Sequence, residues 1–278
     1  MIFFILLVAA ALLVGVALGV RFIENKLIFF PMKGEPVKPE PAPVHEDVAF
    51  EASDGIRLHG WFVPPTVMPA STPAVGSGRG VPVILLLHGN AGNIGHRWEK
   101  IRALGSVGCA VFAIDYRGYG RSGGSPTEAG VYRDVDGACA YLAGRGTPTT
   151  SIIVYGESIG GALAVDLAAR KTVKALIVEN TFTSIADIAK RTFPLIPAVA
   201  LASRMDSLSK IGKVGSPKLV IHSIDDEIVP FEMGKRLFDS AVEPKRFLQL
   251  RGGHNTAFSD DNLNYRGGLT GFLAELAD

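Results

Sequence analysis

The chain of 278 residues has only 2 cysteines, almost no net charge and no internal repeat. Two cysteines cannot form the disulfide framework of a small secreted protein, and Cys109 and Cys139 both have the setting of buried free thiols. With 28 Lys and Arg against 27 Asp and Glu, the sequence lacks the excess of basic residues typical of nucleic-acid binding. A hydrophobic content of 47% excludes a disordered chain.

Nucleotide and metal motifs are also missing. There is no Walker sequence, and His88 and His96 are separated by a gap that fits no common metal-ligand spacing. Residues Gly118–Gly123 match G-x-G-x-x-G, but the next helix is expected only later, and the following acids, Asp134 and Asp136, lie within that helix. We therefore interpret this segment as a structural turn and expect neither a metal nor a cofactor.

What the sequence does contain at its start is a long apolar run. Residues 1–20 carry no charge and no proline, and a helix of that length would cross a bilayer. A cleaved signal peptide would have a basic residue before a shorter run, so an uncleaved transmembrane anchor is favoured over it. Positive charge follows the run at Arg21, Lys26 and Lys33, which predicts a single-pass membrane protein with its catalytic domain on the cytoplasmic side.

Residues 21–45 are expected to form a connector. Five prolines between Pro31 and Pro43 exclude a regular helix there and indicate an extended, semi-rigid spacer. The apolar stretch Leu27–Phe30 could lie at a membrane interface or pack on the following domain, and the sequence does not decide between them. Residues 46–278 are predicted to form one domain.

Strand-like runs alternate with helical patterns from Glu46 onward, which predicts an α/β fold with a mostly parallel eight-stranded sheet and helices on both faces. The turn Ser53–Gly55 between the first two strands favours an antiparallel start. Ser125–Glu128 has the form of a capping box, with proline at the first helical position. The strands are expected at Val48–Ala52, Arg57–Val63, Val81–Leu87, Ala110–Asp115, Ser151–Tyr155, Ala175–Glu179, Lys218–Ile221 and Arg246–Leu250. The helices are expected at Arg97–Leu104, Pro126–Leu142, Ile159–Arg170, Phe231–Ser240 and Leu263–Leu276.

A G-x-S-x-G sequence at Gly156–Gly160 lies between a predicted strand and a predicted helix. This context is typical of a nucleophile elbow, in which a sharp turn forces Ser158 into a sparsely allowed backbone conformation. Side chains at the flanking positions would collide with the strand and the helix, which accounts for the glycines. Ser158 is therefore the predicted nucleophile.

A serine hydroxyl needs a base, and the chain has six histidines. His254 follows the last predicted strand. In a parallel sheet the loops that leave the carboxyl ends of the strands converge on one crevice, where Ser158 also lies. His254 is therefore the predicted general base, whereas His222, which ends the preceding strand, is assigned a structural role.

The base needs a carboxylate to orient it. Asp226 lies in the loop after the strand Lys218–Ile221 and completes the chain order Ser, Asp, His. Asp225, Glu227 and, at a greater distance, Glu179 are rivals, and adjacency alone cannot separate Asp225 from Asp226.

The oxyanion of an acyl-transfer intermediate needs backbone donors. One is expected from the N–H of Ile159, directly after the nucleophile. The other is expected from the loop His88–Asn93 after the third predicted strand, where we name the N–H of Asn90.

With these residues in view, the chain from about Val48 onward resembles an α/β-hydrolase-fold serine hydrolase. It is similar to the membrane-anchored, nearly cap-free branch that includes bacterial esterase-like proteins and eukaryotic depalmitoylase-like proteins. In that branch the acid stands four residues before the proline of a D-x-x-V/I-P pattern, which implies Asp226. The resemblance also implies that Asp115 and Arg117 shape the fold and do not react. It is carried by His88–Asn93, Asp115–Gly120, Gly156–Gly161, Asp226 with Val229–Pro230, and Gly253–His254.

The predicted function is hydrolysis of a carboxylic ester or thioester through an acyl-enzyme intermediate, with a small-molecule or lipid-like acyl substrate. The alternatives are an amidase or peptidase on the same triad and a membrane-tethered scaffold without catalytic activity. Between Asn180 and Pro217 there is room for one or two short helices. Their surroundings offer an acyl pocket formed by Phe182, Phe193, Leu195 and Ile196.

Overall fold

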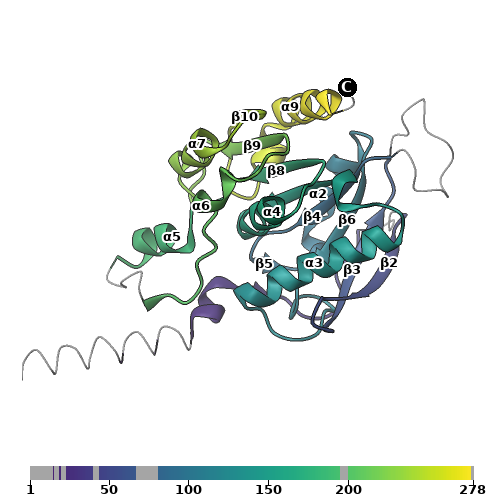
Figure 1. The fold of residues 1–278 in the computed structure, drawn as a ribbon, viewed down its shortest axis with the longest axis horizontal. Coiled ribbons are helices and arrows are strands. Elements are labelled where there is room, and N and C mark those ends of the chain that lie inside the picture. The colour runs from purple at the N-terminus through teal and green to yellow at the C-terminus, as the bar shows by residue number, and fades with distance from the viewer. Residues whose placement is uncertain are drawn as a thin grey trace, which may run out of the picture.

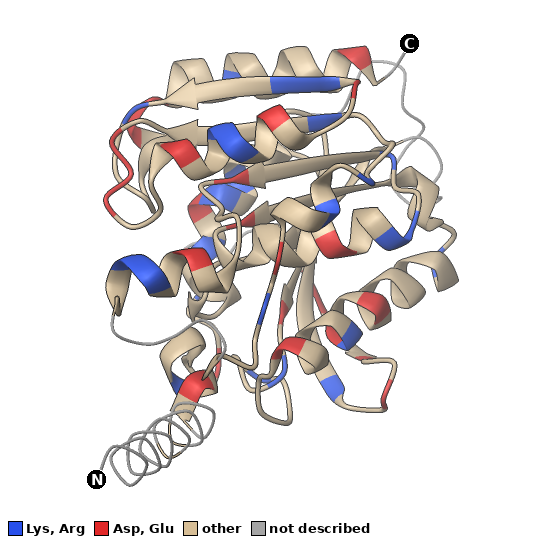
Figure 2. Cartoon of the chain, turned by 60° about the vertical axis from the view of Figure 1, so that its left-hand side comes forward, with Lys and Arg blue, Asp and Glu red and all other residues tan. Residues whose placement is uncertain are grey.

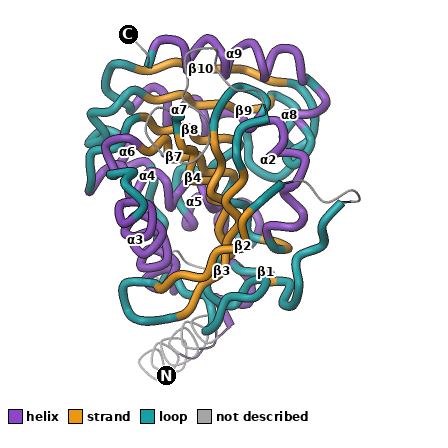
Figure 3. The backbone as a smooth tube through the Cα atoms, turned by 90° about the vertical axis from the view of Figure 1, so that its right-hand side faces the viewer, coloured by secondary structure: helices purple, strands orange, loops and turns teal. Residues whose placement is uncertain are grey.

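The computed structural model describes residues 23–39, 44–66, 81–194 and 200–276, together with Gly15 and Gly19. A sheet of eight strands forms its middle layer, and helices cover both faces (Figures 1 and 3). The strands are β2 (Glu46–Glu51), β3 (Arg57–Val63), β4 (Val83–Leu87), β6 (Ala110–Asp115), β7 (Ile152–Glu157), β8 (Ala175–Glu179), β9 (Lys218–Ser223) and β10 (Lys245–Leu250). All eight predicted strands are therefore confirmed, with shifts of one or two residues at several ends.

The sheet is mixed, with the order β10-β9-β8-β7-β4-β6-β3-β2. The six strands from β10 to β6 run parallel, whereas β3 is antiparallel to both β6 and β2. The prediction of a mostly parallel sheet thus holds for the centre and one edge only. The short turn at Ser53–Gly55 turns the chain back on itself between β2 and β3, as the turn signal indicated.

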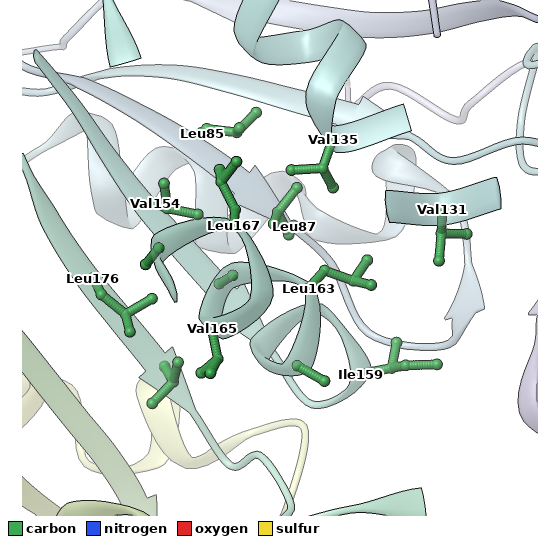
Figure 4. Close-up of a cluster of buried hydrophobic side chains, with 14 of the residues drawn as sticks. Leu85, Leu87, Val131, Val135, Val154, Ile159, Leu163, Val165, Leu167 and Leu176 are labelled. Carbon is green, nitrogen blue, oxygen red and sulfur yellow. The ribbon is translucent and has the colours of Figure 1, made fainter. Parts of the chain in front are cut away.

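Two apolar cores flank the sheet because successive residues of a strand point to opposite faces. In β4, Val83, Leu85 and Leu87 belong to one core, and Ile84 and Leu86 belong to the other. Figure 4 shows part of the first core, where side chains from β4, β7, β8, α3 and α4 meet. Burial on both faces explains why the central strands are continuous apolar runs.

The five predicted helices are present. They are α2 (Trp98–Gly105), α3 (Glu128–Gly144), α4 (Ile159–Arg170), α7 (Phe231–Ser240) and α9 (Asn262–Glu275). Two short helices, α5 (Ile185–Thr192) and α6 (Leu208–Ile211), lie between β8 and β9 as expected. The predicted capping box begins two residues too early, because Thr127 caps α3 by accepting a hydrogen bond from Gly130 N at 3.1 Å.

Residues of the predicted connector pack on the domain. Residues 23–28 are helical, and β1 (Phe30–Pro31) pairs in parallel with β5 (Ala91–Gly92). Phe29 is buried, and Glu24, only 3% exposed, accepts hydrogen bonds from Ala202 N at 2.8 Å and Ser203 N at 2.7 Å. Within Leu27–Phe30, Phe29 is buried in the core and Ile28 packs against it, whereas Leu27 and Phe30 stay 44% and 51% exposed. The predicted division of the chain at residues 20 and 45 stays a prediction.

The predicted membrane localisation is contradicted by the described residues, whereas the transmembrane helix predicted at 1–20 falls outside them. Crossing a bilayer requires an apolar helix of about 20 residues. Within the described ranges, no helix is both long and apolar enough for this. The longest described helix, α3, has 17 residues and includes charged ones. The apolar run at 1–20 lies outside the described residues, except for Gly15 and Gly19.

Candidate active site

The G-x-S-x-G segment forms a sharp turn between β7 and α4. Ser158 has φ 52° and ψ −118°, a conformation that costs a non-glycine residue on the order of 1–3 kcal/mol. The turn is held on both sides of the serine: Ser158 N donates to Glu179 O at 2.9 Å, and Thr181 Oγ1 donates to Ser158 O at 2.6 Å. The surroundings thus hold the serine at the start of a helix in a backbone conformation that it would not adopt alone.

The glycines of this turn are required by close packing. A Cβ atom on Gly156 would lie 2.3 Å from the carbonyl oxygen of Gly160, and one on Gly160 would lie 2.0 Å from the carbonyl oxygen of Leu87. A Cβ on Gly161 would lie 2.5 Å from the side chain of Thr181. The steric reason given for these glycines from the sequence therefore agrees with the distances.

His254 and Asp226 lie in contact. The ring nitrogen His254 Nδ1 is 2.7 Å from Asp226 Oδ2, and the Asp226 side chain is fully buried. The other oxygen, Asp226 Oδ1, accepts hydrogen bonds from Ile228 N at 2.9 Å and Val229 N at 2.7 Å. Two backbone donors and one imidazole thus fix the orientation of this carboxylate.

The other candidate carboxylates make different contacts. Asp225 is half-exposed and lies 3.7 Å from Arg251 Nη1. Glu227 accepts a hydrogen bond from His254 N at 2.9 Å, so it holds the backbone of His254 and not its ring. Glu179 pairs with Lys100. Among the described residues, Asp226 is therefore the carboxylate in hydrogen-bond contact with the His254 ring.

Asn180 is a supporting residue that no motif in the sequence indicates. It has φ 47°, its side-chain nitrogen donates to His254 O at 2.8 Å, and its side-chain oxygen accepts from Ser223 N at 2.9 Å. It thereby ties the His254 loop to the end of β9. His222 is buried behind Asp226 and lies 3.0 Å from Val229 O through Nε2. Burial lowers the pKa of His222, which keeps its ring neutral.

The loop around Asn90 is fixed from several directions. His88 Nδ1 donates to Gly89 O at 2.7 Å, and this carbonyl belongs to the same planar peptide as the N–H of Asn90, so its hydrogen bond sets the direction of that N–H. The carbonyl of Asn90 accepts from Phe30 N at 2.9 Å and from Tyr119 Oη at 2.7 Å. The side chain of Asn90 also donates to Ile28 O at 3.2 Å.

Two cavities open at the same point. One, of about 350 Å³, is lined mainly by aliphatic and aromatic side chains, including Phe182 and Phe193 as predicted. The other, of about 200 Å³, is lined mainly by charged and polar side chains. Leu195 and Ile196, predicted for the acyl pocket, lie outside the described residues. Both cavities share five lining residues: Gly89, Arg97, Ser158, His254 and Asn255.

Ser158 and His254 therefore face common space, at the place where the carboxyl ends of the parallel strands converge. In the described part of the chain, no hydrogen bond joins the Ser158 hydroxyl to the His254 ring. Such contacts are often long before substrate binds, so this arrangement is compatible with the pairing.

A buried charged cluster lines part of the polar cavity. Lys100, only 2% exposed, pairs with Glu179 and lies 3.1 Å from Glu157 Oε1. Tyr155 Oη also donates to Glu179. Burial opposes a charge on Lys100, but the two carboxylates outweigh it and raise the pKa of Lys100 above its ordinary value. Lys100 therefore stays charged and holds both carboxylates.

No metal centre is evident here. Across the described ranges, no group of three or more His, Cys, Asp or Glu side chains is placed to hold a metal ion. Residues Gly118–Gly123 form a turn beside Arg117, whose guanidinium pairs with Asp54 and Asp134. Within the segment, Gly118 N donates to Gly123 O at 2.8 Å, and Gly123 N donates to Arg57 O at 2.9 Å, which ties the turn to β3. The charges over the drawn elements are mixed in sign (Figure 2).

Comparison with known proteins places this architecture. A family model described as "Serine aminopeptidase, S33" matches residues 80–209, a range that contains Asn90 and Ser158 but ends before Asp226 and His254. The uncharacterized protein Rv2307c of Mycobacterium tuberculosis is 36% identical over 95% of this chain and 92% of its own. The α/β hydrolase domain-containing protein WAV2 of Arabidopsis thaliana is 35% identical over 82% of this chain and 78% of its own.

Solved structures show the same fold. The esterase Pf2001 of Pyrococcus furiosus superimposes with a TM-score of 0.69 at 16% identity, over 88% of this chain and 98% of that one. The esterase domain of a Rhodothermus marinus protein superimposes with a TM-score of 0.60 at 24% identity, over 82% and 97% of the two chains. Together with the sequence relatives, these findings establish that the chain belongs to the α/β-hydrolase family and is a hydrolase.

Proposed function

We propose that this hydrolase cleaves carboxylic ester or thioester bonds through Ser158, His254 and Asp226. His254 takes the proton of the Ser158 hydroxyl, and the serine oxygen attacks the acyl carbonyl. The N–H groups of Asn90 and Ile159 stabilise the resulting oxyanion. His254 then protonates the leaving alcohol or thiol, and in a second step it deprotonates the water that releases the acid and regenerates Ser158.

The observation that carries this proposal is the contact of 2.7 Å between His254 Nδ1 and the buried Asp226, with His254 and the strained Ser158 lining the same two cavities. Asp226 holds the tautomer that leaves Nε2 of His254 free to accept a proton, and it stabilises the imidazolium that forms. A backbone conformation as strained as that of Ser158 is typical of residues at active and binding sites.

The apolar cavity supports an acyl group as the substrate part bound beside Ser158. Its wall carries Leu27, Ile28, Ile185 and Phe193, among others, and these side chains would cover an alkyl chain. The described segments that contribute them are short, so the described part of the chain places no large covering domain over this cavity.

An amidase or peptidase has weaker support. A peptidase that recognises a free amino group needs an unpaired carboxylate near the nucleophile. In the described site, Glu157 and Glu179 both lie against Lys100, and Glu157 also lies 3.6 Å from Arg97 Nε, so the two cations compensate the two carboxylates. A scaffold without activity would have no use for the strain at Ser158.

The experiment is labelling of the purified protein with a fluorophosphonate probe, followed by hydrolysis of p-nitrophenyl esters. We expect labelling and turnover in the unaltered protein and the loss of both in Ser158→Ala. Ser151→Ala is the matched control, because Ser151 is an exposed serine directly before β7, whereas Ser158 directly follows that strand. Labelling that persists in Ser158→Ala would contradict the assignment, and faster cleavage of acyl anilides than of esters would favour an amidase.

A further inference from the structure

The polar cavity beside Ser158 has no part in the mechanism proposed above. It occupies about 200 Å³ and reaches the same serine and histidine as the apolar cavity. An ester has two parts that leave the carbonyl carbon in different directions. If the acyl chain lies in the apolar cavity, the polar cavity is the space left for the alcohol.

The chemistry of the polar cavity is that of a site for hydroxyl groups. Arg97 and Glu157 both line it, and Arg97 Nε lies 3.6 Å from Glu157 Oε2, beyond a good hydrogen bond. Arg97 Nε is buried and has no hydrogen-bond partner within the described structure. A buried donor without a partner is costly, so a hydroxyl group beside this pair would be stabilised once a small rotation of the guanidinium brings an N–H to it.

A hydroxyl group fits this pair because it both donates and accepts. It would accept a hydrogen bond from Arg97 and donate one to Glu157. An alkyl group would satisfy neither residue. Asn180 and Asn255 add further neutral polar groups to the lining.

The balance of charge argues against an ionic alcohol. Two cations, Arg97 and Lys100, line the cavity together with three carboxylates, Glu99, Glu157 and Glu179. The carboxylates oppose phosphate-bearing leaving groups. Lys100 and Arg97 together compensate Glu157 and Glu179, so the exposed Glu99 is the negative charge that remains for a cation in this lining. A neutral, hydroxylated alcohol meets both conditions.

We infer that the polar cavity binds the alcohol part of the substrate through Arg97 and Glu157, and that the preferred substrates are apolar acyl esters of polyhydroxylated alcohols. This inference rests on the proposed esterase function. It adds a specificity determinant, since Arg97 and Glu157 select the leaving group and take no part in proton transfer.

The first test uses the unaltered protein and two esters that differ only in their hydroxyl groups: 2,3-dihydroxypropyl butyrate and n-propyl butyrate. We expect kcat/KM for the dihydroxypropyl ester to be higher by at least about tenfold, the size expected for one hydrogen bond to a charged group. Equal values, or a preference for the propyl ester, would overturn the inference while leaving the esterase function intact. Hydrolysis of neither ester, nor of the p-nitrophenyl esters, would instead contradict the proposed function.

Butyrylcholine, which carries a cation in place of the hydroxyls, is the third substrate. If it is cleaved faster than the dihydroxypropyl ester, the cavity recognises positive charge and the inference is wrong.

Two variants then locate the preference. In Arg97→Met and Glu157→Gln, the ratio of kcat/KM for the dihydroxypropyl ester to kcat/KM for the propyl ester should fall severalfold or more toward one. The ratio is measured on one protein sample, so a general loss of activity cancels. Ile188→Ala, in the apolar cavity, is the control and should leave the ratio unchanged. A ratio that stays high in both variants would refute the role of Arg97 and Glu157.

Discussion

The backbone N–H of Phe30 donates a hydrogen bond of 2.9 Å to the carbonyl oxygen of Asn90. The side-chain amide of Asn90 in turn donates a hydrogen bond of 3.2 Å to Ile28 O. A segment that precedes the sheet in the sequence thus fixes the residue that we propose as an oxyanion donor. The same segment lines the apolar cavity with Glu24, Leu27 and Ile28.

Replacing Phe30 by proline tests the hydrogen bond from Phe30 N to Asn90 O, because proline has no N–H to donate. We expect Phe30→Pro to lower kcat for a p-nitrophenyl ester by about tenfold, part of the 10²- to 10³-fold loss that follows complete removal of an oxyanion donor. Phe30→Ala keeps the N–H and removes only an exposed ring, so it should change kcat little. Equal activities of the two variants would show that the hydrogen bond to Asn90 does not matter for catalysis.

Asp226→Asn should lower kcat by roughly 10⁴-fold with little change in structure, because an amide in place of the carboxylate no longer fixes the tautomer of His254. Steady-state hydrolysis of a p-nitrophenyl ester measures this effect. Asp225→Asn, one residue away and half-exposed, should cost only a few-fold. If Asp225→Asn lowered kcat more than Asp226→Asn, Asp225 and not Asp226 would be the carboxylate that orients His254.

Gly160→Ala should destabilise the protein severely, by several kcal/mol, since the new methyl group would lie 2.0 Å from Leu87 O. Gly267→Ala provides the contrast. Gly267 is an exposed residue within α9 with no atom within 4 Å of an added Cβ, so alanine there should stabilise the protein by about 1 kcal/mol. Urea unfolding followed by circular dichroism measures both, and a stable Gly160→Ala protein would contradict the packing described for the turn.

Asp115 should make stability depend on pH in the acid range. Burial alone would raise its pKa, but contacts with His59 and His88 and a hydrogen bond from Ile94 N outweigh it and keep the pKa below the ordinary value of 3.8. A carboxylate with a lowered pKa in the folded state contributes stability above its unfolded pKa and loses it as the pH falls.

The free energy of unfolding should therefore fall more steeply between pH 5 and about pH 3 in the unaltered protein than in Asp115→Asn, because the amide that replaces the carboxylate cannot titrate. Urea titrations at several pH values measure this difference. Parallel pH profiles for the two proteins would show that Asp115 keeps an ordinary pKa.

Much of this fold follows from local patterns. The strands of the central sheet are continuous apolar runs because helices cover them on both sides, and such runs are readable without coordinates. Gly156, Gly160 and Gly161 are equally readable, since no other residue fits their close contacts. These patterns lead to Ser158 and to the convergence of strand ends around it.

Contacts between distant segments are not readable in the same way. Nothing in the sequence around Asn180 indicates that its side chain bridges His254 and Ser223, because His254 lies in the loop after β10 and Ser223 ends β9. The same holds for the pairing of β1 with β5, and for Glu24 against Ala202 and Ser203. The prolines after Pro31 indicate a spacer, yet the residues just before them bury Phe29 and Glu24. The proline content indicates that a segment is stiff. Whether that segment packs on the domain depends on complementary surfaces elsewhere in the chain.

The contacts of Glu24 with Ala202 and Ser203 limit how far this enzyme can be shortened from its N-terminal side. A shortened chain that starts at Glu46 would keep every strand of the main sheet and all three proposed catalytic side chains, and it could fold and still turn over poorly. It would lack one wall of the apolar cavity and leave the backbone N–H groups of Ala202 and Ser203 without their acceptor. Low activity in such a truncated protein would reflect the missing wall and the missing hydrogen bond to Asn90 O, and would say little about the chemistry of Ser158.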